Sequence, residues 1–322
     1  MSDRPPLPIH DITVAAGARG QARIPVARIT TGEWTYLTVE VLHGARPGPA
    51  LWLSGAIHGD ELDGVEIIRR TVEHLDPGRM AGTVLAVPIV NVFGFQAEDR
   101  YLPDRRDLNR SFPGSNRGST AAQLAHLFMK EIVSRCAYGI DFHCGSDGRE
   151  NLPQVRGDLK DEETLALARA FGAPMVIHGR PPDGSLRKAA VKRRVRVLLY
   201  EGGEAGRFTP EAIEAGVLGT LRVLHALDIM AGPAETPPAG LESWATRWVR
   251  APRSGICRLD IGLGEMVRKG QRLGVVGDAA GRASSPVRAR VPGVVIGRRV
   301  RPPVYQGQAI IHLAEIRPET RP

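Results

Sequence analysis

Residues 50–61 of the chain are Ala50-Leu51-Trp52-Leu53-Ser54-Gly55-Ala56-Ile57-His58-Gly59-Asp60-Glu61. The first four form a continuous apolar run, which is typical of a short buried strand, and Ser54-Gly55 ends it. Apolar residues then recur at helical spacing from about Leu62 to Leu75. A buried strand that passes through a polar turn into a helix is the repeating unit of α/β proteins. We therefore expect an α/β fold, with this polar turn at the end of a strand.

Strand and helix patterns alternate along the chain to about residue 230. The strand patterns lie at 33–41, 83–90, 138–143, 174–177 and 195–200, and the helical patterns lie at 120–133, 161–171 and 210–229. Thr120 and Gln123 have the spacing of a capping box, and Thr209-Pro210 has that of a cap followed by a first-turn proline. Such alternation predicts a mainly parallel or mixed sheet flanked by helices.

A change of pattern near residue 230 indicates a second domain. Residues 231–240 are rich in Pro, Gly and Ala, as in a linker, and beyond them short β patterns alternate with glycines. We place a first domain at 1–235, with an N-terminal β segment at 1–48, and a smaller all-β domain at 241–322. The smaller domain resembles biotinyl/lipoyl modules in its alternation of short β patterns and glycine turns. It lacks the Met-Lys hairpin that carries the modified lysine in those modules. We therefore expect neither biotin nor lipoate.

Length and composition exclude several classes of protein. The chain has 322 residues, of which 42% are hydrophobic and 24% charged, an ordinary balance for a globular protein. No apolar run approaches the ~18 residues that span a membrane, and the N-terminus lacks the basic and apolar segments of a signal peptide. Three widely spaced cysteines do not make a disulfide framework. We expect a cytoplasmic protein with reduced thiols and no membrane association.

The net charge of +8 is concentrated at the C-terminal end. Residues 241–322 carry 15 Lys/Arg and 6 Asp/Glu, whereas the rest of the chain carries 28 and 29. A basic region can bind nucleic acid or attract anionic substrates, and it can also be a solvated face. Because no nucleic-acid reader motif accompanies these arginines, we expect no nucleic-acid partner.

Two histidines and a glutamate follow predicted strands. His58 and Glu61 lie just past the strand that ends at Gly55, and His143 ends the strand pattern at 138–143. Two His and one Glu can hold catalytic zinc with a fourth position left to water. In open α/β sheets, sites form beyond the carboxyl ends of strands, where both segments are expected. Asp141 could pair with His143 or anchor the turn. Because such spacings also occur by chance, structural roles stay open at this point.

Two further segments suit a reaction site. Residues 100–114 form a polar loop rich in arginine, which suits a substrate carboxylate because guanidinium groups bind carboxylates bidentately. A solvated charged loop would look the same. Glu201 follows the strand pattern at 195–200 and precedes Gly202-Gly203. A carboxylate there is well placed for a general base, or it could simply end the strand.

Four motifs, in order along the chain, carry a family resemblance. They are Gly55-x-x-His58-Gly59-Asp60-Glu61, Asp107-Leu108-Asn109-Arg110-x-Phe112-Pro113-Gly114, Asp141-x-His143 and Glu201-x-Gly203. In these motifs, which cover about residues 50–205, the chain resembles the succinylglutamate desuccinylase/aspartoacylase family, a branch of the zinc carboxypeptidase-like fold. The resemblance implies that residues 1–235 adopt this fold and form a zinc-dependent catalytic domain.

The resemblance implies roles for the metal and its water. His58, Glu61 and His143 would bind one Zn²⁺ per chain. Glu201 would be the general base that activates the zinc-bound water and then protonates the leaving amine. Asp107 would shape its turn rather than perform chemistry.

The resemblance also implies how the substrate is held. Asn109 and Arg110 would grip the carboxylate of the substrate. Arg100 would polarise the scissile carbonyl and stabilise the oxyanion, but its alignment is loose, and Arg105 and Arg106 are nearby alternatives.

The chain is therefore expected to be a metal-dependent hydrolase of linear amides. It would remove an acyl group from an N-acylated amino acid or a similar small carboxylate. One alternative is a zinc carboxypeptidase-type peptidase, which the fold allows, and another is a non-catalytic binding protein with a vestigial site. The acyl group, the amine product and the oligomeric state stay open, and a homo-oligomer is compatible with the resemblance. Tyr305 is a weak candidate for a substrate contact from the C-terminal domain.

Overall fold

The computed structural model describes residues 4–232, 236–281 and 283–316. The strands before the linker are β1 (Leu7–Ile9), β2 (Ile12–Val14), β3 (Ala18–Arg28), β4 (Trp34–His43), β5 (Arg46–Ser54), β6 (Ala81–Val87), β7 (Tyr138–Gly145), β8 (Arg149–Gly157), β9 (Met175–His178) and β10 (Arg196–Glu204). The helices are α1 (Asp63–Glu73), α2 (Val92–Ala97), α3 (Thr120–Glu131), α4 (Glu162–Phe171), α5 (Leu186–Val191) and α6 (Pro210–Ala226), with 3-10 turns η1 (Leu108–Arg110) and η2 (Val133–Arg135).

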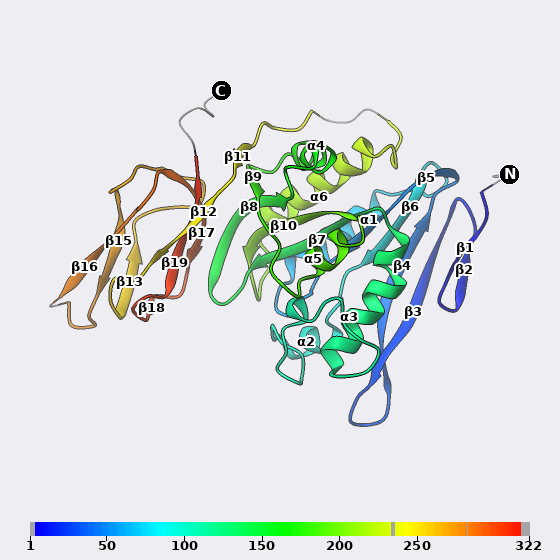
Figure 1. Cartoon of the computed structure of the whole chain (residues 1–322), viewed down its shortest axis with the longest axis horizontal. Coiled ribbons are helices and arrows are strands. Elements are labelled where there is room, and N and C mark those ends of the chain that lie inside the picture. Colours follow the sequence, from blue (N-terminus) through cyan, green and yellow to red (C-terminus); the bar gives the residue numbers. More distant parts are fainter. Residues whose placement is uncertain (1–3, 233–235, 282, 317–322) are drawn as a thin grey trace.

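A mixed sheet forms the centre of the molecule, with helices on both faces (Figure 1). Strands β6, β5, β7 and β10 are parallel neighbours, and β4 and β8 pair with them in the antiparallel direction at either side. Leu51 and Leu53 of β5 face a core that includes buried residues of α1, α4 and α6. Trp52, between them, faces the core beneath α3 and α5. This alternation follows from the period of two along a strand, and it confirms the predicted α/β fold.

All the strands and helices expected between residues 33 and 229 are present, with small shifts at their ends. The expected cap of α3 is wrong by one residue. Ser119 rather than Thr120 is the N-cap, because its side chain accepts a hydrogen bond from the backbone N–H of Ala122. Thr209 does occupy the cap position of α6, with proline following it, but its side chain makes no capping bond.

Three elements were not expected from the sequence. Helices α2 and α5 span only six residues each, too few to show a helical period. Strand β8 reads Arg-Glu-Asn-Leu-Pro-Gln-Val-Arg-Gly, without alternation of apolar and polar residues. It is held by neighbours on both sides, since it pairs with β10 and also with β17 from the C-terminal part of the chain.

The C-terminal strands are β11 (Leu241–Ser243), β12 (Thr246–Arg250), β13 (Gly255–Leu259), β14 (Met266–Val267), β15 (Arg272–Gly277), β16 (Ser284–Arg288), β17 (Gly293–Arg299), β18 (Pro303–Val304) and β19 (Ala309–Glu315). Four of them form a separate sheet in the order β16-β15-β13-β18, which encloses a core with β12, β17 and β19. An all-β region at the C-terminal end is thereby confirmed.

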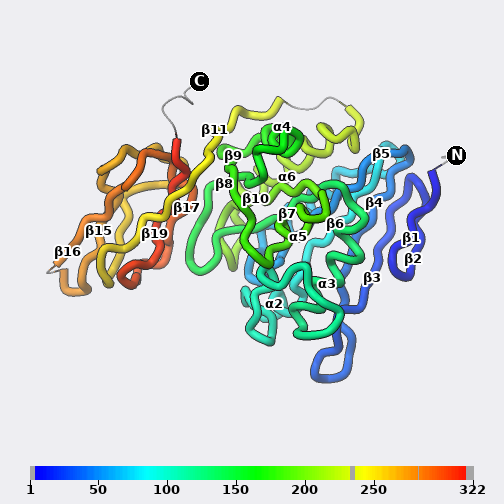
Figure 2. The backbone as a smooth tube through the Cα atoms, in the orientation of Figure 1, coloured from blue at the N-terminus to red at the C-terminus, as the bar shows by residue number. Residues whose placement is uncertain are grey.

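The central sheet continues into this all-β region. Gly297 of β17 pairs with Asn151 of β8, and β11 runs parallel to β9. Figure 2 shows the chain returning past β9 after α6 and ending in strands beside β8. The boundary drawn at residues 235–241 stays a prediction, and part of the linker, 233–235, lies outside the described residues.

Within the described ranges, no helix is both long and apolar enough to cross a membrane.

Candidate active site

The motif residues meet at the carboxyl ends of three parallel strands. His58 and Glu61 lie in the turn between β5 and α1, and His143 lies near the end of β7. Glu201 of β10 is the register partner of His143. Side chains at paired positions of parallel strands point to the same face, so the sheet itself places this carboxylate beside the histidine. The structure therefore brings these four motif residues together at one edge of the sheet.

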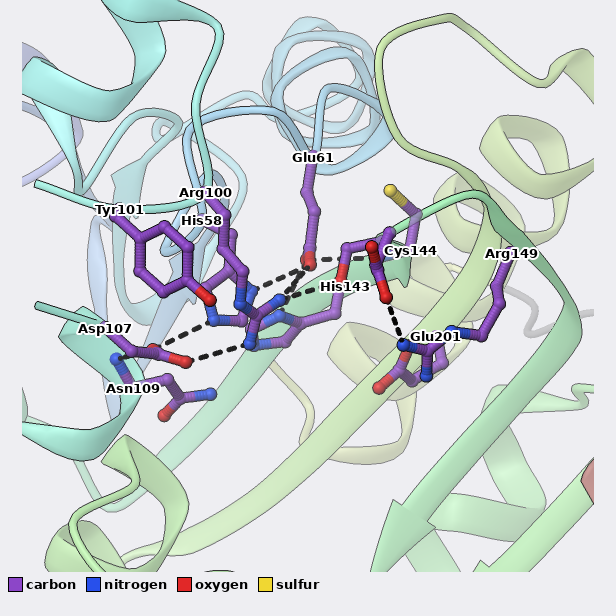
Figure 3. A network of polar contacts seen from close by, with 12 residues as sticks. His58, Glu61, Arg100, Tyr101, Asp107, Asn109, His143, Cys144, Arg149 and Glu201 are labelled. Atoms are coloured by element: carbon purple, nitrogen blue, oxygen red, sulfur yellow. Dashed lines mark hydrogen bonds and ion pairs between the residues drawn. The ribbon is translucent and has the colours of Figure 1, made fainter. Parts of the chain in front are cut away.

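Two histidines and a glutamate converge in a buried cluster (Figure 3). The ligand atoms of His58, Glu61 and His143 lie within 4.8 Å of one another. His58 Nδ1 is 2.7 Å from one carboxylate oxygen of Glu61, and His143 Nδ1 is 2.8 Å from the other. Each of the three residues is less than 5% exposed. Two imidazole nitrogens and a carboxylate directed at one point make up the donor set of a three-residue metal site.

The outer nitrogen of each histidine is held by a second carboxylate. His58 Nε2 lies 3.2 Å from Asp107 Oδ1, and His143 Nε2 lies 3.0 Å from Asp141 Oδ2. Ser54 Oγ donates to the other oxygen of Asp141 at 2.7 Å. Carboxylate partners of this kind orient a metal-binding imidazole, which supports the metal-ligand reading of both histidines. Asp107 also accepts from the backbone N–H of Asn109 and so shapes its turn as expected, but its contact with His58 was not foreseen.

The electrostatics of the cluster are those of a cation site. Burial opposes charge on His58, but Glu61 and Asp107 outweigh it and raise the pKa of His58. His143 is also buried, yet Asp141 and Glu61 raise its pKa well above the ordinary value. Burial would raise the pKa of Glu61, but the two histidines hold it well below its usual range. Negative charge is thus concentrated where a divalent cation would be coordinated.

Of the three arginines considered for the scissile carbonyl, Arg100 lies nearest to the cluster. Its guanidinium is 3.5 Å from Glu61, 2.9 Å from Asp107 and 2.7 Å from Ser146 Oγ. The side chains of Arg105 and Arg106 are 83% and 64% exposed and face acidic residues of their own loop.

Asn109 and Arg110 lie at the same pocket in different environments. Asn109 is buried, and its Oδ1 accepts a hydrogen bond of 2.9 Å from the backbone N–H of Leu186, at the start of α5. Arg110 is exposed and donates to the backbone carbonyl of Asn109. Asn109 therefore connects the polar loop of residues 100–114 to α5. Its position in the sequence did not reveal this connection.

The cluster opens into a cavity of about 470 Å³. Glu201 lines it (Figure 3). Asn151 Nδ2 donates to Glu201 Oε2 at 2.8 Å and so holds the carboxylate. Strands β12 and β19 supply Trp248 and His312 to the wall. Their rings stack with centroids 4.0 Å apart. Tyr305, the residue suggested by sequence, is 79% exposed and lies outside this lining.

Buried arginine is a feature of the cavity that sequence reasoning missed. Arg187 in α5 is 5% exposed, and burial, together with the nearby charge of Arg156, lowers its pKa to about 10. Arg156 of β8 lines the same cavity and donates to Gln154 through Nε and Nη2. Neither residue belongs to a recognisable local motif, so only the fold brings them to the site.

Cys144 follows His143 in a setting that does not favour a nucleophilic thiolate. Its side chain is buried, and burial, together with Glu61 and neighbouring carboxylates, raises the pKa of the thiol well above its ordinary value. A thiolate is therefore disfavoured.

Comparisons with known proteins agree with these observations. Residues 47–227 match the family model of the succinylglutamate desuccinylase/aspartoacylase catalytic domain. The chain is 29% identical to N-alpha-acetyl-L-2,4-diaminobutyric acid deacetylase of Halomonas elongata, over 96% of this chain and 90% of that protein. It is 28% identical to a succinylglutamate desuccinylase/aspartoacylase from Rhodobacter sphaeroides, whose crystal structure superposes with a TM-score of 0.84 over 93% of this chain and 96% of the other.

A further solved structure shares the fold. The product-bound ectoine utilization protein EutE (DoeB) of Ruegeria pomeroyi superposes with a TM-score of 0.86, at 23% identity, over 97% of this chain and 98% of that one. The family model covers more than half of the chain. The protein is therefore a member of the succinylglutamate desuccinylase/aspartoacylase family and an amide hydrolase.

Proposed function

We propose that this protein is a zinc-dependent deacylase of small N-acylated amino acids, with one zinc ion held by His58, Glu61 and His143. The observation that carries the proposal is the convergence of two Nδ1 atoms on the two oxygens of Glu61, with both Nε2 atoms anchored by carboxylates. Nitrogen and carboxylate ligands in this number favour zinc with an open coordination position. When bound, zinc lowers the pKa of a water molecule and polarises a carbonyl oxygen.

Glu201 is the proton carrier in this proposal. Its position beside His143 brings the carboxylate to the edge of the metal site. Because Asn151 donates to Oε2, the orientation of the carboxylate is set before the substrate binds. The carboxylate would take a proton from the attacking water and pass it to the nitrogen of the amine as the amide bond breaks.

Arg100 is the proposed stabiliser of negative charge on the acyl oxygen. It is held by Asp107 and Ser146 and lies 3.5 Å from Glu61, so its guanidinium is fixed beside the metal site. A cation positioned before the reaction stabilises the oxyanion most strongly in the transition state.

The substrate class follows from the pocket and the relatives. A cavity of about 470 Å³ suits a small molecule, and the relative from Halomonas elongata is named for the deacetylation of an N-acetylated amino acid. Asn109 and Arg110 line the cavity and are proposed to contact the substrate carboxylate, Arg110 from the exposed rim.

The test is hydrolysis by zinc-loaded protein of a panel of N-acetyl, N-succinyl and N-formyl amino acids, with peptides included to detect carboxypeptidase activity. Glu201→Gln should retain the metal and lose turnover by roughly 10²–10⁴-fold. Glu204→Gln is the matched control, because Glu204 lies on the same strand but pairs with Arg207 and does not line this cavity. Normal turnover by Glu201→Gln, or no hydrolysis of any panel member, would contradict the proposal.

A further inference from the structure

A glycine of strand β17 lies against the side chain that holds Glu201. Gly297 is the register partner of Asn151 in β8 on one side and of His312 in β19 on the other. It is buried, and its backbone does not have the positive φ that favours glycine. A glycine inside a strand weakens it, because there is no side chain to pack, and it often marks a close approach of a neighbouring group. The atoms around Gly297 therefore show what the glycine makes room for.

The space beside Gly297 is occupied by the amide of Asn151. A Cβ at position 297 would lie 2.7 Å from Asn151 Oδ1, well inside the 3.4 Å at which ordinary contacts begin. The same Cβ would lie 3.5 Å from the carbonyl oxygen of Glu150 and 3.5 Å from the Cβ of His312, which are ordinary contacts. A side chain at this position would therefore collide with one group, and that group donates to Glu201 Oε2 at 2.8 Å.

Strand β17 is held against β8 on both sides of Gly297. Gln154 Nε2 of β8 donates to the carbonyl oxygen of Ile296 at 3.0 Å, and Arg298 pairs with Glu150 of β8. The two strands are therefore fixed relative to each other at the residues before and after the glycine. An added side chain there would displace the flexible amide beside it rather than separate the strands.

The geometry points to Gly297 as a positioning residue for the general base, acting through Asn151 from the C-terminal strands. Because Gly297 has no side chain, the amide of Asn151 reaches the place from which it donates to Glu201. The C-terminal strands thereby complete the proton-transfer apparatus in addition to lining the cavity. The inference rests on the proposed function, in which Glu201 carries the proton.

Gly297→Ala adds one methyl group and tests the inference directly. Asn151 Oδ1 would have to retreat by about 0.7 Å to reach an ordinary contact. Its amide nitrogen belongs to the same planar group and would move away from Glu201. Since a misplacement of ~1 Å can cost ~100-fold in rate, the zinc-loaded variant should lose roughly 10-fold in kcat, with KM within about twofold of the wild type. The zinc content and the urea midpoint should not change, because only a flexible side chain shifts.

Two further variants separate this effect from a general effect of alanine in a strand. Gly277→Ala, in β15, would place its Cβ 3.3 Å from the carbonyl oxygen of Ala283, and Gly277 does not line the cavity, so its kcat should equal that of the wild type. In Asn151→Ala the group that the methyl would displace is already removed. Adding Gly297→Ala to that variant should therefore change kcat by less than about twofold.

The outcomes distinguish this inference from the proposed function. A wild-type kcat in Gly297→Ala, failure of this variant to fold, or an equal loss of kcat when it is added to Asn151→Ala overturns the inference. Normal turnover by Glu201→Gln, or no hydrolysis of the panel by the wild type, instead rejects the proposed function. A crystal structure of Gly297→Ala gives a readout that needs no substrate, since it should show the amide of Asn151 turned away from Glu201. An unmoved amide would also overturn the inference.

Discussion

Replacing His312 by phenylalanine should make the folded protein less sensitive to acid. His312 lies in β19, is 5% exposed and stacks on Trp248. Burial, followed by the charges of Arg156 and Arg149, lowers the pKa of His312 to about 3. In the unfolded chain the same side chain titrates near ~6.5. Between these values the unfolded chain binds a proton that the folded protein does not, so the free energy of unfolding falls as the pH falls from about 6.5 towards 3.

The size of the effect follows from these two pKa values. At pH 5 the pH is about 1.5 units below the unfolded pKa, which corresponds to roughly 2 kcal/mol of lost stability at ~1.36 kcal/mol per unit. At pH 6 the loss is roughly 1 kcal/mol. His312→Phe keeps an aromatic ring against Trp248 and cannot bind a proton, so the variant should lack this part of the acid dependence.

The assay is urea unfolding of wild type and variant at pH 7.5, 6 and 5, with chelator present so that both proteins are metal-free. Taking the difference between the two proteins cancels every other titrating group, including His58 and His143. His312→Gln, which is neutral but not aromatic, should show the same loss of acid dependence. If wild type and both variants lose stability in parallel between pH 7.5 and pH 5, the inference that burial keeps His312 uncharged in the folded protein is refuted.

Three further predictions concern the site itself. Asn151→Ala frees Glu201 from its 2.8 Å hydrogen bond, so kcat should fall by roughly 10–100-fold with unchanged metal content. Steady-state kinetics together with metal analysis checks this prediction. An unaltered kcat would contradict it. Asp141→Asn weakens the anchor of His143 and should lower metal affinity by roughly 10–100-fold in competition with a chelator, whereas equal affinity would remove Asp141 from that role. Gly59→Ala places a Cβ 1.9 Å from the backbone of α2, so chemical denaturation should show a loss of about 1–3 kcal/mol, and a stable variant would show that α2 moves aside.

Much of the candidate site could be predicted because its parts are local. His58 lies just past β5, whereas His143 and Glu201 lie near the ends of β7 and β10, and the carboxyl ends of parallel strands meet at one edge of a sheet. The order of the motifs then indicated the family. Short elements such as α2 and α5 could not be predicted, since six residues hold less than two helical turns.

The sequence by itself determined the α/β class, the family and the residues that converge on the cluster of His58, Glu61 and His143, because periodicity and motif spacing are properties of neighbouring residues. Only the tertiary structure decided which nitrogen of each histidine faces Glu61, and that Arg100 rather than Arg105 lies at the cluster. It also brought Arg187 and His312 into one cavity from α5 and β19. Both side chains are buried, and His312 stacks on Trp248 of another strand. Neither burial nor a contact with a distant residue can be recognised in a local sequence pattern.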